Sequence, residues 1–356
     1  MDNKLLIAPL LALAAGAASA QSSVSLYGIV DAAVRYTTNA GPTVATNGES
    51  QTQLAPGGMS QSRLGINVSE DMGGGMKGLV NLEHRFNSDN GTQAAADFWR
   101  QAWVGVQGGF GRVTLGRQYN VLFDVFTSSY ASFKYSPYIE AYKPEIGFSL
   151  GARNDNMVKY LIESGPLRAA VQVSGGEGSA TGGKSYGAYV RYANGPLTLG
   201  GAYMELQDGA ANKAKATTVG AAYSSGPWNA SLGWARNKFD TAFNPAIIAS
   251  LLGNGGTNGT FALGNVEHRD MISVGGGYQI TPQLNLGAHY WLTKQTGKTA
   301  AGDGKGHFFA VVADYALSKR TDVYLEIDKT RFKDGVTFTN GATSRVGTMV
   351  GVRHRF

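Results

Sequence analysis

The sequence predicts an all-β protein, a sixteen-stranded antiparallel transmembrane β-barrel with one long loop folded into its interior. Three observations lead to this prediction. From Ser23 to the last residue, short segments alternate apolar and polar side chains, which is the pattern of half-buried strands. Tight turns alternate with long polar connections, as in outer-membrane barrels. Beyond the N-terminal segment, no apolar run is long enough to cross a membrane as a helix.

The N-terminal segment, residues 1–20, reads as a cleavable secretory signal. Lys4 precedes an apolar run that ends in the small residues Ala18-Ser19-Ala20. A transmembrane helix would need about 20 apolar residues, and this run is shorter. We therefore expect an exported protein whose mature chain, residues 21–356, is a single β-barrel domain.

The composition narrows the class of protein further. Gly accounts for 50 of 356 residues, Tyr and Phe for 17 and 15, and Pro for only 10, which suits strands, turns and aromatic belts. Because the chain has no Cys, an exported fold must be held without disulfides. The net charge of +6 is a modest basic excess, and since no lysine-rich run accompanies it we expect no nucleic-acid partner.

Tight turns recur about every thirty residues. Residues 163–166, 193–196 and 224–227 each contain Gly-Pro, which breaks a strand and reverses the chain. Two of these turns follow a tyrosine at the same offset, Tyr192 and Tyr223, on the apolar phase of the strand. The tyrosines fit an aromatic belt at a membrane interface.

An even number of strands brings both ends of the chain to one side and permits closure, so that no strand edge remains unpaired in lipid. Sixteen strands enclose an aqueous channel. The predicted strands, with bounds uncertain by about 2–4 residues, are 23–38, 59–71, 76–86, 98–107, 112–118, 156–163, 167–175, 185–194, 197–206, 216–225, 228–239, 267–280, 283–294, 306–317, 321–332 and 344–356.

Three connections are too long for simple hairpins: residues 39–58, 119–155 and 240–266. The middle connection is rich in aromatic side chains, too rich for a solvated tail. We expect it to fold inward and pack in the lumen. Its aromatic residues are Phe123, Phe126, Tyr130, Phe133, Tyr135, Tyr138, Tyr142 and Phe148.

With these features in place, the chain from Ser23 to Phe356 resembles the Gram-negative general diffusion porins. The resemblance is carried by the order and spacing of several short motifs. They are Ser25-Leu26-Tyr27-Gly28 with Asp31, Ser62-Arg63-Leu64-Gly65, Arg100-Gln101-Ala102-Trp103-Val104-Gly105, Leu115-Gly116-Arg117-Gln118-Tyr119, and the alternating end Val350 to Phe356.

The resemblance implies a homotrimer in the outer membrane whose third external loop constricts the pore. That loop corresponds to residues 119–155, and its Pro144-Glu145-Ile146-Gly147 resembles the family's acidic segment. Asp124 and Glu145 are therefore expected to supply carboxylates to the constriction. Because the loop is spaced differently here, Glu140 and Asp155 remain alternatives.

Opposite the loop, the family carries a wall of basic side chains. Arg63 and Arg100 match its motifs, and Arg85 shares the lumen phase of its strand with Asn81 and Glu83. Charged walls filter ions without a tight binding site, so we expect a weak anion preference. Arg117 is left for the trimer contact. Further basic residues at expected lumen positions are Arg35, Arg153, Arg345, Arg353 and Lys77.

The resemblance also implies the remaining partners. The terminal Phe356 is expected to serve as the signal read by the barrel-assembly machinery. The other expected partners are outer-membrane lipid, lipopolysaccharide and the small hydrophilic solutes and ions that pass the pore. No cofactor and no metal site are expected, since the long loops hold no repeated Asp-rich calcium array.

Other classes of barrel would require features that this sequence shows only in part or not at all. A barrel enzyme would need a localised catalytic set, and only Glu267-His268-Arg269-Asp270 suggests one; alternation places His268 and Asp270 on one face and Glu267 on the other. The glycines at 108–111 read as a turn and not as a nucleotide loop. A substrate-specific channel would use tyrosines of the inserted loop as a track. A purely structural barrel would need no inserted loop.

Overall fold

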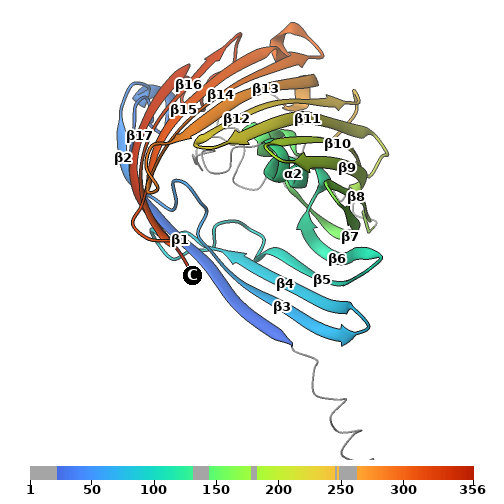
Figure 1. The fold of residues 1–356 in the computed structure, drawn as a ribbon. Helices are drawn as coiled ribbons and strands as arrows, with labels where there is room; N and C mark the ends of the chain where they lie inside the picture. Colours follow the sequence, from blue (N-terminus) through green and yellow to red (C-terminus); the bar gives the residue numbers. More distant parts are fainter. Residues whose placement is uncertain (1–21, 131–143, 178–182, 245–246, 248–262) are drawn as a thin grey trace, which may run out of the picture.

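The structure is a computed structural model, and it describes residues 22–130, 144–177, 183–244, 247 and 263–356. One antiparallel sheet curls into a closed barrel, because β1 pairs with β17 on one side and with β3 on the other (Figure 1). The strands are β1 (Ser23–Thr37), β2 (Gln51–Ala55), β3 (Arg63–Gly73), β4 (Met76–Arg85), β5 (Trp99–Gly108), β6 (Gly111–Tyr119), β7 (Arg153–Ser164), β8 (Leu167–Ser174), β9 (Lys184–Asn194), β10 (Leu197–Gln207), β11 (Lys213–Ser225), β12 (Trp228–Phe239), β13 (Val266–Gln279), β14 (Leu284–Gly297), β15 (Gly304–Ala316), β16 (Thr321–Lys333) and β17 (Ser344–Arg355).

The sixteen predicted strands correspond to β1 and β3 to β17, so the predicted barrel is confirmed. The short strand β2 was not predicted, because its polar pattern reads as part of a loop. It pairs with Ala33–Thr37 of β1, directly beyond the stretch Ser23–Ile29 that pairs with β3. The two strands thus share one position in the wall, and between them residues 56–62, the inserted segment, leave the sheet.

The two faces of the wall differ as the alternation predicts, with the apolar face outward. On β16, Leu325 and Ile327 are 44% and 48% exposed, whereas Glu326 and Asp328 between and beside them are buried. A soluble sandwich would show the reverse arrangement. The apolar outer face is suited to lipid and the polar inner face to water.

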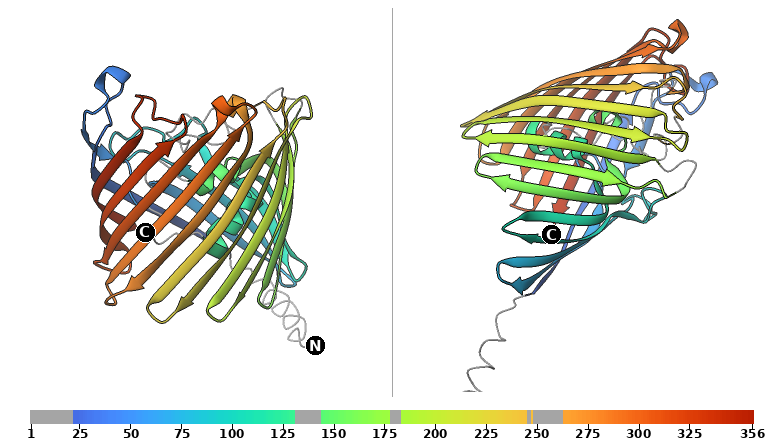
Figure 2. Two further views of the ribbon diagram at one scale, coloured as in Figure 1. Left: turned by 90° about the horizontal axis from the view of Figure 1, so that it is seen from above. Right: turned by 90° about the vertical axis from the view of Figure 1, so that its right-hand side faces the viewer.

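The predicted Gly-Pro turns each join two strands through two residues. Gly165, Gly195 and Gly226 adopt φ of +56°, +55° and +56°, a left-handed conformation that other residues rarely take. These turns lie at the barrel end where Gly28 and Phe356 exchange backbone hydrogen bonds of 3.0 and 3.1 Å. The longer connections lie at the opposite end (Figure 2). By the rule for such barrels, the tight turns are periplasmic and the long loops extracellular.

The helical pieces are short and lie in the connections. They are α2 (Val121–Val125), η2 (Phe126–Tyr130) and α3 (Pro144–Phe148) in the long middle loop, and η1 (Val44–Thr46), η4 (Leu263–Asn265) and η5 (Ala300–Gly302) elsewhere. Within the described residues, no helix has the length and apolar character needed to cross a membrane.

Both described parts of the middle loop lie inside the barrel (Figure 1). The helix α2 starts at Asn120, whose side chain accepts a 2.9 Å hydrogen bond from the Phe123 amide. The Val121 amide donates to Gln172 on the inner face of β8 at 2.7 Å. Tyr130 is only 2% exposed and its hydroxyl contacts that of Thr218 on β11. The first described part of the loop, residues 120–130, therefore packs against the inner faces of β8 and β11.

Candidate functional site

Three arginines on adjacent strands form the basic part of the inner wall. Arg63 of β3 lies directly opposite Arg85 of β4 in the strand register, and Arg100 follows on β5. Arg85 and Arg100 are each 6% exposed, on the same face as Glu83. We call Arg63, Arg85 and Arg100 the arginine wall. In the structure, all three arginines lie on the inward-facing phase of their strands, the phase that the sequence predicted for them.

Carboxylates stand among these arginines. Arg100 donates to Glu83, and Arg85 forms a 2.5 Å ion pair with Asp97, in the connection between β4 and β5. Arg117 reaches the other oxygen of Asp97 at 3.0 Å. Burial alone would raise the pKa of Asp97, but the guanidinium groups of Arg85 and Arg117 outweigh burial and hold this pKa below its usual value. The sequence analysis did not single out Asp97, which no motif marks.

An aromatic ring extends the wall towards β7. The guanidinium carbons of Arg100 and Arg153 lie 5.3 and 5.2 Å from the centre of the Tyr119 ring, within cation–π range. The same ring stacks on Phe123 of α2 at 4.4 Å. Tyr119 therefore joins the basic wall to the inserted loop.

The expected loop carboxylates take separate positions. Asp124 in α2 forms an ion pair with Lys159 on β7, with 2.7 Å between the carboxylate oxygen and the ammonium nitrogen. Glu145 in α3 is 6% exposed and accepts a 2.5 Å hydrogen bond from the Trp291 indole on β14. Asp155, one of the alternatives, pairs with Arg117 and its side chain is 58% exposed. Glu140, the other, lies outside the described residues.

The inner wall holds a second charged region, on β1, β16 and β17, that the sequence analysis did not assign. Arg35 pairs with Asp328 at 2.7 Å, and Arg353 pairs with Asp322 at 3.0 Å. Arg35 and Arg353 were expected in the lumen. Their carboxylate partners, Asp322 and Asp328, lie on the inward-facing positions of β16, so the alternation along that strand could have identified these carboxylates. Asp31 also belongs here and binds the inserted segment.

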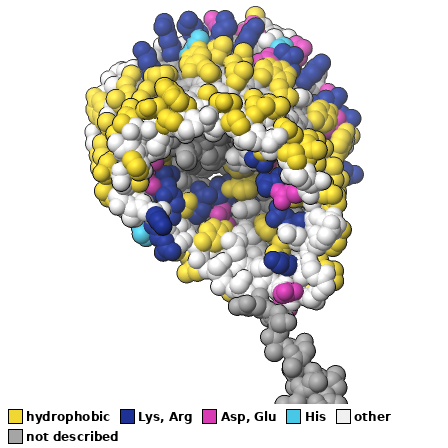
Figure 3. Space-filling view, in the orientation of Figure 1, with side chains coloured by type: hydrophobic (Ala, Val, Ile, Leu, Met, Phe, Trp, Pro, Cys, Tyr) yellow, Lys and Arg dark blue, Asp and Glu magenta, His cyan; other side chains and the backbone are white. Residues whose placement is uncertain are grey.

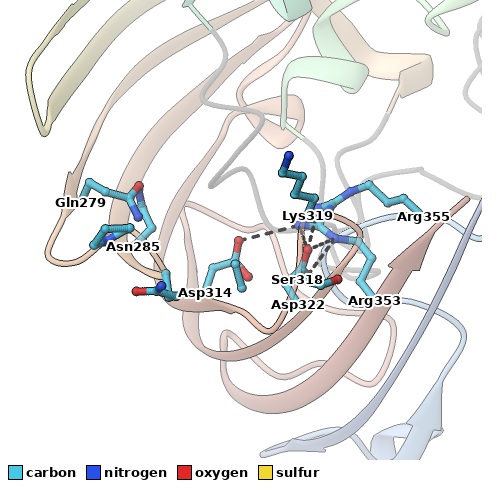
Figure 4. Close-up of a pocket in the computed structure, with 11 residues that line it drawn as sticks. Gln279, Asn285, Asp314, Ser318, Lys319, Asp322, Arg353 and Arg355 are labelled. Carbon is cyan, nitrogen blue, oxygen red and sulfur yellow. Dashed lines mark hydrogen bonds and ion pairs between the residues drawn. The ribbon is translucent and has the colours of Figure 1, made fainter.

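A depression of about 590 Å³ opens at the periplasmic end of this region. Asp322 forms ion pairs with Arg353 and, at 2.7 Å, with Arg355. Asp314 lies 3.8 Å from Arg353 (Figure 4). Lys319 also lines the depression. The mouth is therefore lined by charges of both signs.

The features that suggested other classes of barrel have structural explanations. His268 lies 3.9 and 3.8 Å from Glu267 and Asp270, but Asp270 is bound by Arg236 at 2.6 Å on the outer face. The glycines at 108–111 form the turn between β5 and β6. Among the described residues there is no group of three or more His, Cys, Asp or Glu side chains suited to a metal ion.

A substrate-specific channel would line its path with tyrosines of the middle loop. Of these tyrosines, the structure describes only Tyr130. Tyr130 is buried against the wall and so cannot line an open path. Tyr135, Tyr138 and Tyr142 lie outside the described residues.

Comparison with known proteins agrees with this architecture. The model of the Gram-negative porin family matches residues 8–335. The chain is 30% identical to outer membrane porin protein 32 of Delftia acidovorans, over 99% of this chain and 100% of that one. It is 29% identical to an outer membrane porin of Bordetella pertussis over the full length of both chains.

Solved structures have the same fold. A structure described as an anion-selective porin from Comamonas acidovorans superposes with a TM-score of 0.75 at 27% identity, covering 94% of this chain and 100% of that chain. Salmonella typhi OmpF superposes with a TM-score of 0.70 at 16% identity, covering 94% and 97%, a likeness of fold alone. A barrel with a polar inner wall, matched over its length by porins, is a water-filled diffusion channel of the outer membrane: the chain belongs to the Gram-negative porin family.

Proposed function

We propose that this porin passes small hydrophilic solutes and ions without binding any one of them tightly, and that it weakly prefers anions. The observation that carries the proposal is the arginine wall, in which three guanidinium groups lie on adjacent strands of the inner face. Arginine keeps its charge when partly desolvated, so the wall stays positive at any physiological pH. A positive wall raises the local concentration of anions.

The constriction proposed here has two sides. Arg63, Arg85 and Arg100 form the basic side, and the middle loop with Asp124, Glu140 and Glu145 forms the acidic side. Supporting this division, Asp124 and Glu145 lie on described parts of a loop that packs inside the barrel. The solved Comamonas structure, which is described as anion-selective and is 27% identical to this chain, supports the direction of selectivity.

The proposed assembly is a homotrimer of mature chains that begin at Gln21. Support comes from the family resemblance and from one solved structure of the same fold, Vibrio cholerae OmpT, which is described in a trimer form. Signal removal fits the leader-like pattern of residues 1–20.

Single-channel recording of the purified, unheated protein under a salt gradient tests the proposal. Large current steps in threes with a reversal potential that favours anions are expected. A reversal potential that favours cations would contradict the role of the arginine wall. Silent bilayers would contradict an open channel, and current that saturates with one solute would indicate a substrate-specific channel.

A further inference from the structure

The depression at the periplasmic end of the lumen, which we call the periplasmic mouth site, has two chemically different sides. Amide side chains, those of Gln279 and Asn285, line one side, and the cations Lys319, Arg353 and Arg355 line the other (Figure 4). Basic and acidic side chains also lie together on the rim of the hollow in Figure 3. The volume of about 590 Å³ is within the range of sites for small molecules.

The cationic side holds more positive than negative charge. Arg353 and Arg355 share one carboxylate, since Arg353 binds Oδ1 of Asp322 at 3.0 Å and Arg355 binds Oδ2 at 2.7 Å. Lys319 lines the depression outside these ion pairs, in the exposed turn between β15 and β16. Three cations therefore face one carboxylate. The Arg355 side chain is 39% exposed and Lys319 is also exposed, so both can contact a solute.

The opposite side ends in an acceptor that the protein leaves unused. The amide nitrogen of Gln279 donates to the Thr281 carbonyl at 2.8 Å, which leaves the Gln279 oxygen to face Asn285. The amide nitrogen of Asn285 donates to that oxygen at 2.7 Å. These two bonds fix the orientation of the Asn285 amide. Its oxygen, Oδ1, is buried and has no hydrogen-bond partner among the described residues, and Asn285 as a whole is 8% exposed. A buried acceptor of this kind needs a donor, which a ligand can supply.

Asp314 places a negative charge beside Asn285. The two residues lie directly opposite each other in the register between β15 and β14. Side chains at directly opposed positions start about 5 Å apart, so one ligand group can reach both. The Asp314 carboxylate lies 3.8 Å from Arg353, at the long end of ion-pair distance. An ammonium group, which has three N–H donors, suits Asn285 and Asp314 together.

Ligands of a single sign match this arrangement less well. A simple anion would meet the carboxylates of Asp314 and Asp322, and a simple cation would meet the three cations. A zwitterion can direct its ammonium to Asp314 and its carboxylate to Lys319 and Arg355. Since β16 separates β15 from β17, the two sides are about 10 Å apart at the backbone, and the long cationic side chains shorten that gap. The two charges of the solute must therefore lie several atoms apart.

We propose that the periplasmic mouth site binds zwitterionic solutes whose ammonium and carboxylate lie several atoms apart, as in the shortest peptides. The proposal rests on the proposed diffusion function, because the site lies where a solute that has passed the constriction leaves the barrel. The carboxylate of the solute would accept charge-assisted hydrogen bonds from Lys319 and Arg355. Binding has to be weak for the solute to leave, so we expect a dissociation constant on the order of millimolar.

The test measures the binding of diglycine to the full mature protein in detergent, by saturation-transfer NMR titration at low salt. Two further probes of similar size each lack one charge: N-acetyl-diglycine has no ammonium, and diglycine amide has no carboxylate. The wild type should bind diglycine about tenfold more tightly than either blocked probe, since each blocked probe loses one charged contact. Equal binding of all three probes would overturn the proposal. Tightest binding of N-acetyl-diglycine would do so too, because the depression would then be a simple anion site.

Two variants test the two sides separately. Lys319→Gln should lower the preference for diglycine over diglycine amide about threefold, since Arg355 remains, and should leave the preference over N-acetyl-diglycine unchanged. Asp314→Asn should do the reverse. Lys319→Arg keeps the charge and should keep both preferences. Lys77→Gln is the matched control, because it removes a lysine from the same end of the barrel, on β4. An equal effect of Lys77→Gln and Lys319→Gln would overturn the proposal.

Single-channel conductance of the same proteins separates this proposal from the proposed function. All variants should conduct as the wild type does, because none of these side chains belongs to the proposed constriction. Silent wild-type bilayers would contradict the diffusion function itself. An open wild-type channel that shows no preference for diglycine would overturn the site alone. Lys319→Gln changes an exposed turn, so it keeps the test decisive even if Asp314→Asn does not fold.

Discussion

The Tyr324 hydroxyl donates a 2.6 Å hydrogen bond to the carboxylate of Asp31, which joins β16 to β1 inside the barrel. The same carboxylate accepts the backbone amides of Gly58, Met59 and Ser60 at 3.1, 3.1 and 2.7 Å. Asp31 is fully buried. One side chain thus fixes the inserted segment to the inner wall, at the point where the chain leaves the sheet between β2 and β3.

Replacement of Asp31 by Ala should release the inserted segment. Three buried amides would lose their acceptor, and each buried unsatisfied donor costs about 1–3 kcal/mol, so we expect a loss of roughly 3 kcal/mol or more in unfolding free energy. The single-channel conductance should rise, because a piece of chain leaves the lumen. Urea unfolding and single-channel recording measure the two effects. Tyr324→Phe is the control: it removes one of the four bonds and should cost only about 1 kcal/mol. An Asp31→Ala channel of unchanged conductance would contradict the anchoring role.

Reversing the charge of Arg63 should shift selectivity towards cations. Arg63→Glu changes the wall by two unit charges, and at about 8 Å in water each is worth roughly 0.5 kcal/mol, so the permeability ratio should change about fivefold. Arg63 is the better target because Arg100 contacts Glu83, and a second carboxylate there would repel the first. The measurement is the reversal potential at low salt. Arg168→Glu is a matched control: this β8 arginine is near the periplasmic turn and already paired with Glu163, so its effect should be smaller. Equal shifts in both variants would show that the arginine wall has no special role.

Gly220 and Gly233, which have no side chains, leave the space on the inner wall that the Tyr130 ring occupies. A Cβ on Gly220 would lie 2.2 Å from the Tyr130 ring, and one on Gly233 would lie 2.5 Å from it. Gly220→Ala should therefore displace the ring and loosen the loop, with noisier open-channel current. Tyr130→Ala should do the same and lower stability by about 3 kcal/mol, since it empties a buried aromatic site.

A double-mutant cycle separates this contact from a general effect of either change. With Tyr130 replaced by Ala, the added Gly220→Ala should cost little, because the ring that it would strike is absent. Gly201→Ala is the control, as its Cβ would meet its nearest atom, on Val219, at 3.2 Å. Simple additivity of the two changes would argue against the proposed contact.

The strands and their faces were predictable because a barrel repeats one local rule. Alternation fixed the lumen phase of Arg63, Arg85 and Arg100, and Gly-Pro fixed the tight turns at Gly165 and Gly195. Alternation and turn residues are local features of the chain. They can therefore be read from neighbouring residues, without knowing which strands close the barrel.

The partners of those residues were less predictable, since they come from distant segments. Nothing near Asp31 in the sequence indicates the amides of residues 58–60 or the hydroxyl of Tyr324, 293 residues away. Glu145 was expected to serve the pore on the basis of its motif, but a motif does not specify that the Trp291 indole will bind it. The strand β2 was missed because it is only five residues long and Leu54 is its one large apolar residue, so that no alternation can be recognised.

Removal of the Asp97 charge should make the channel more anion-selective. Arg85 and Arg117 would lose a shared counter-ion, so Asp97→Asn should raise the anion preference at neutral pH. Because these arginines lower the pKa of Asp97 in the folded state, its stabilising charge is present above the usual value of 3.8 and is lost only as the pH falls below it. The wild type should thus approach the selectivity of the variant in strong acid. Reversal potentials over a pH series measure this; a constant difference between the two channels at every pH would contradict it.

The aromatic end of the chain permits assembly and stability to be tested separately. The Phe356 amide and carbonyl exchange hydrogen bonds with Gly28, and its ring lies where a Cβ on Gly28 would approach within 2.3 Å. Phe356→Ala keeps both backbone bonds and alters a half-exposed ring, so refolding in detergent and stability should change by less than about 1 kcal/mol. If the residue acts as the assembly signal, the same variant should nevertheless reach the outer membrane in much smaller amounts. Gly28→Ala is the matched control: it displaces the ring in the folded barrel but leaves the terminal Phe available to the assembly machinery, so its membrane level should stay near that of the wild type. Equal losses in both variants would locate the role of Phe356 in the folded contact with Gly28.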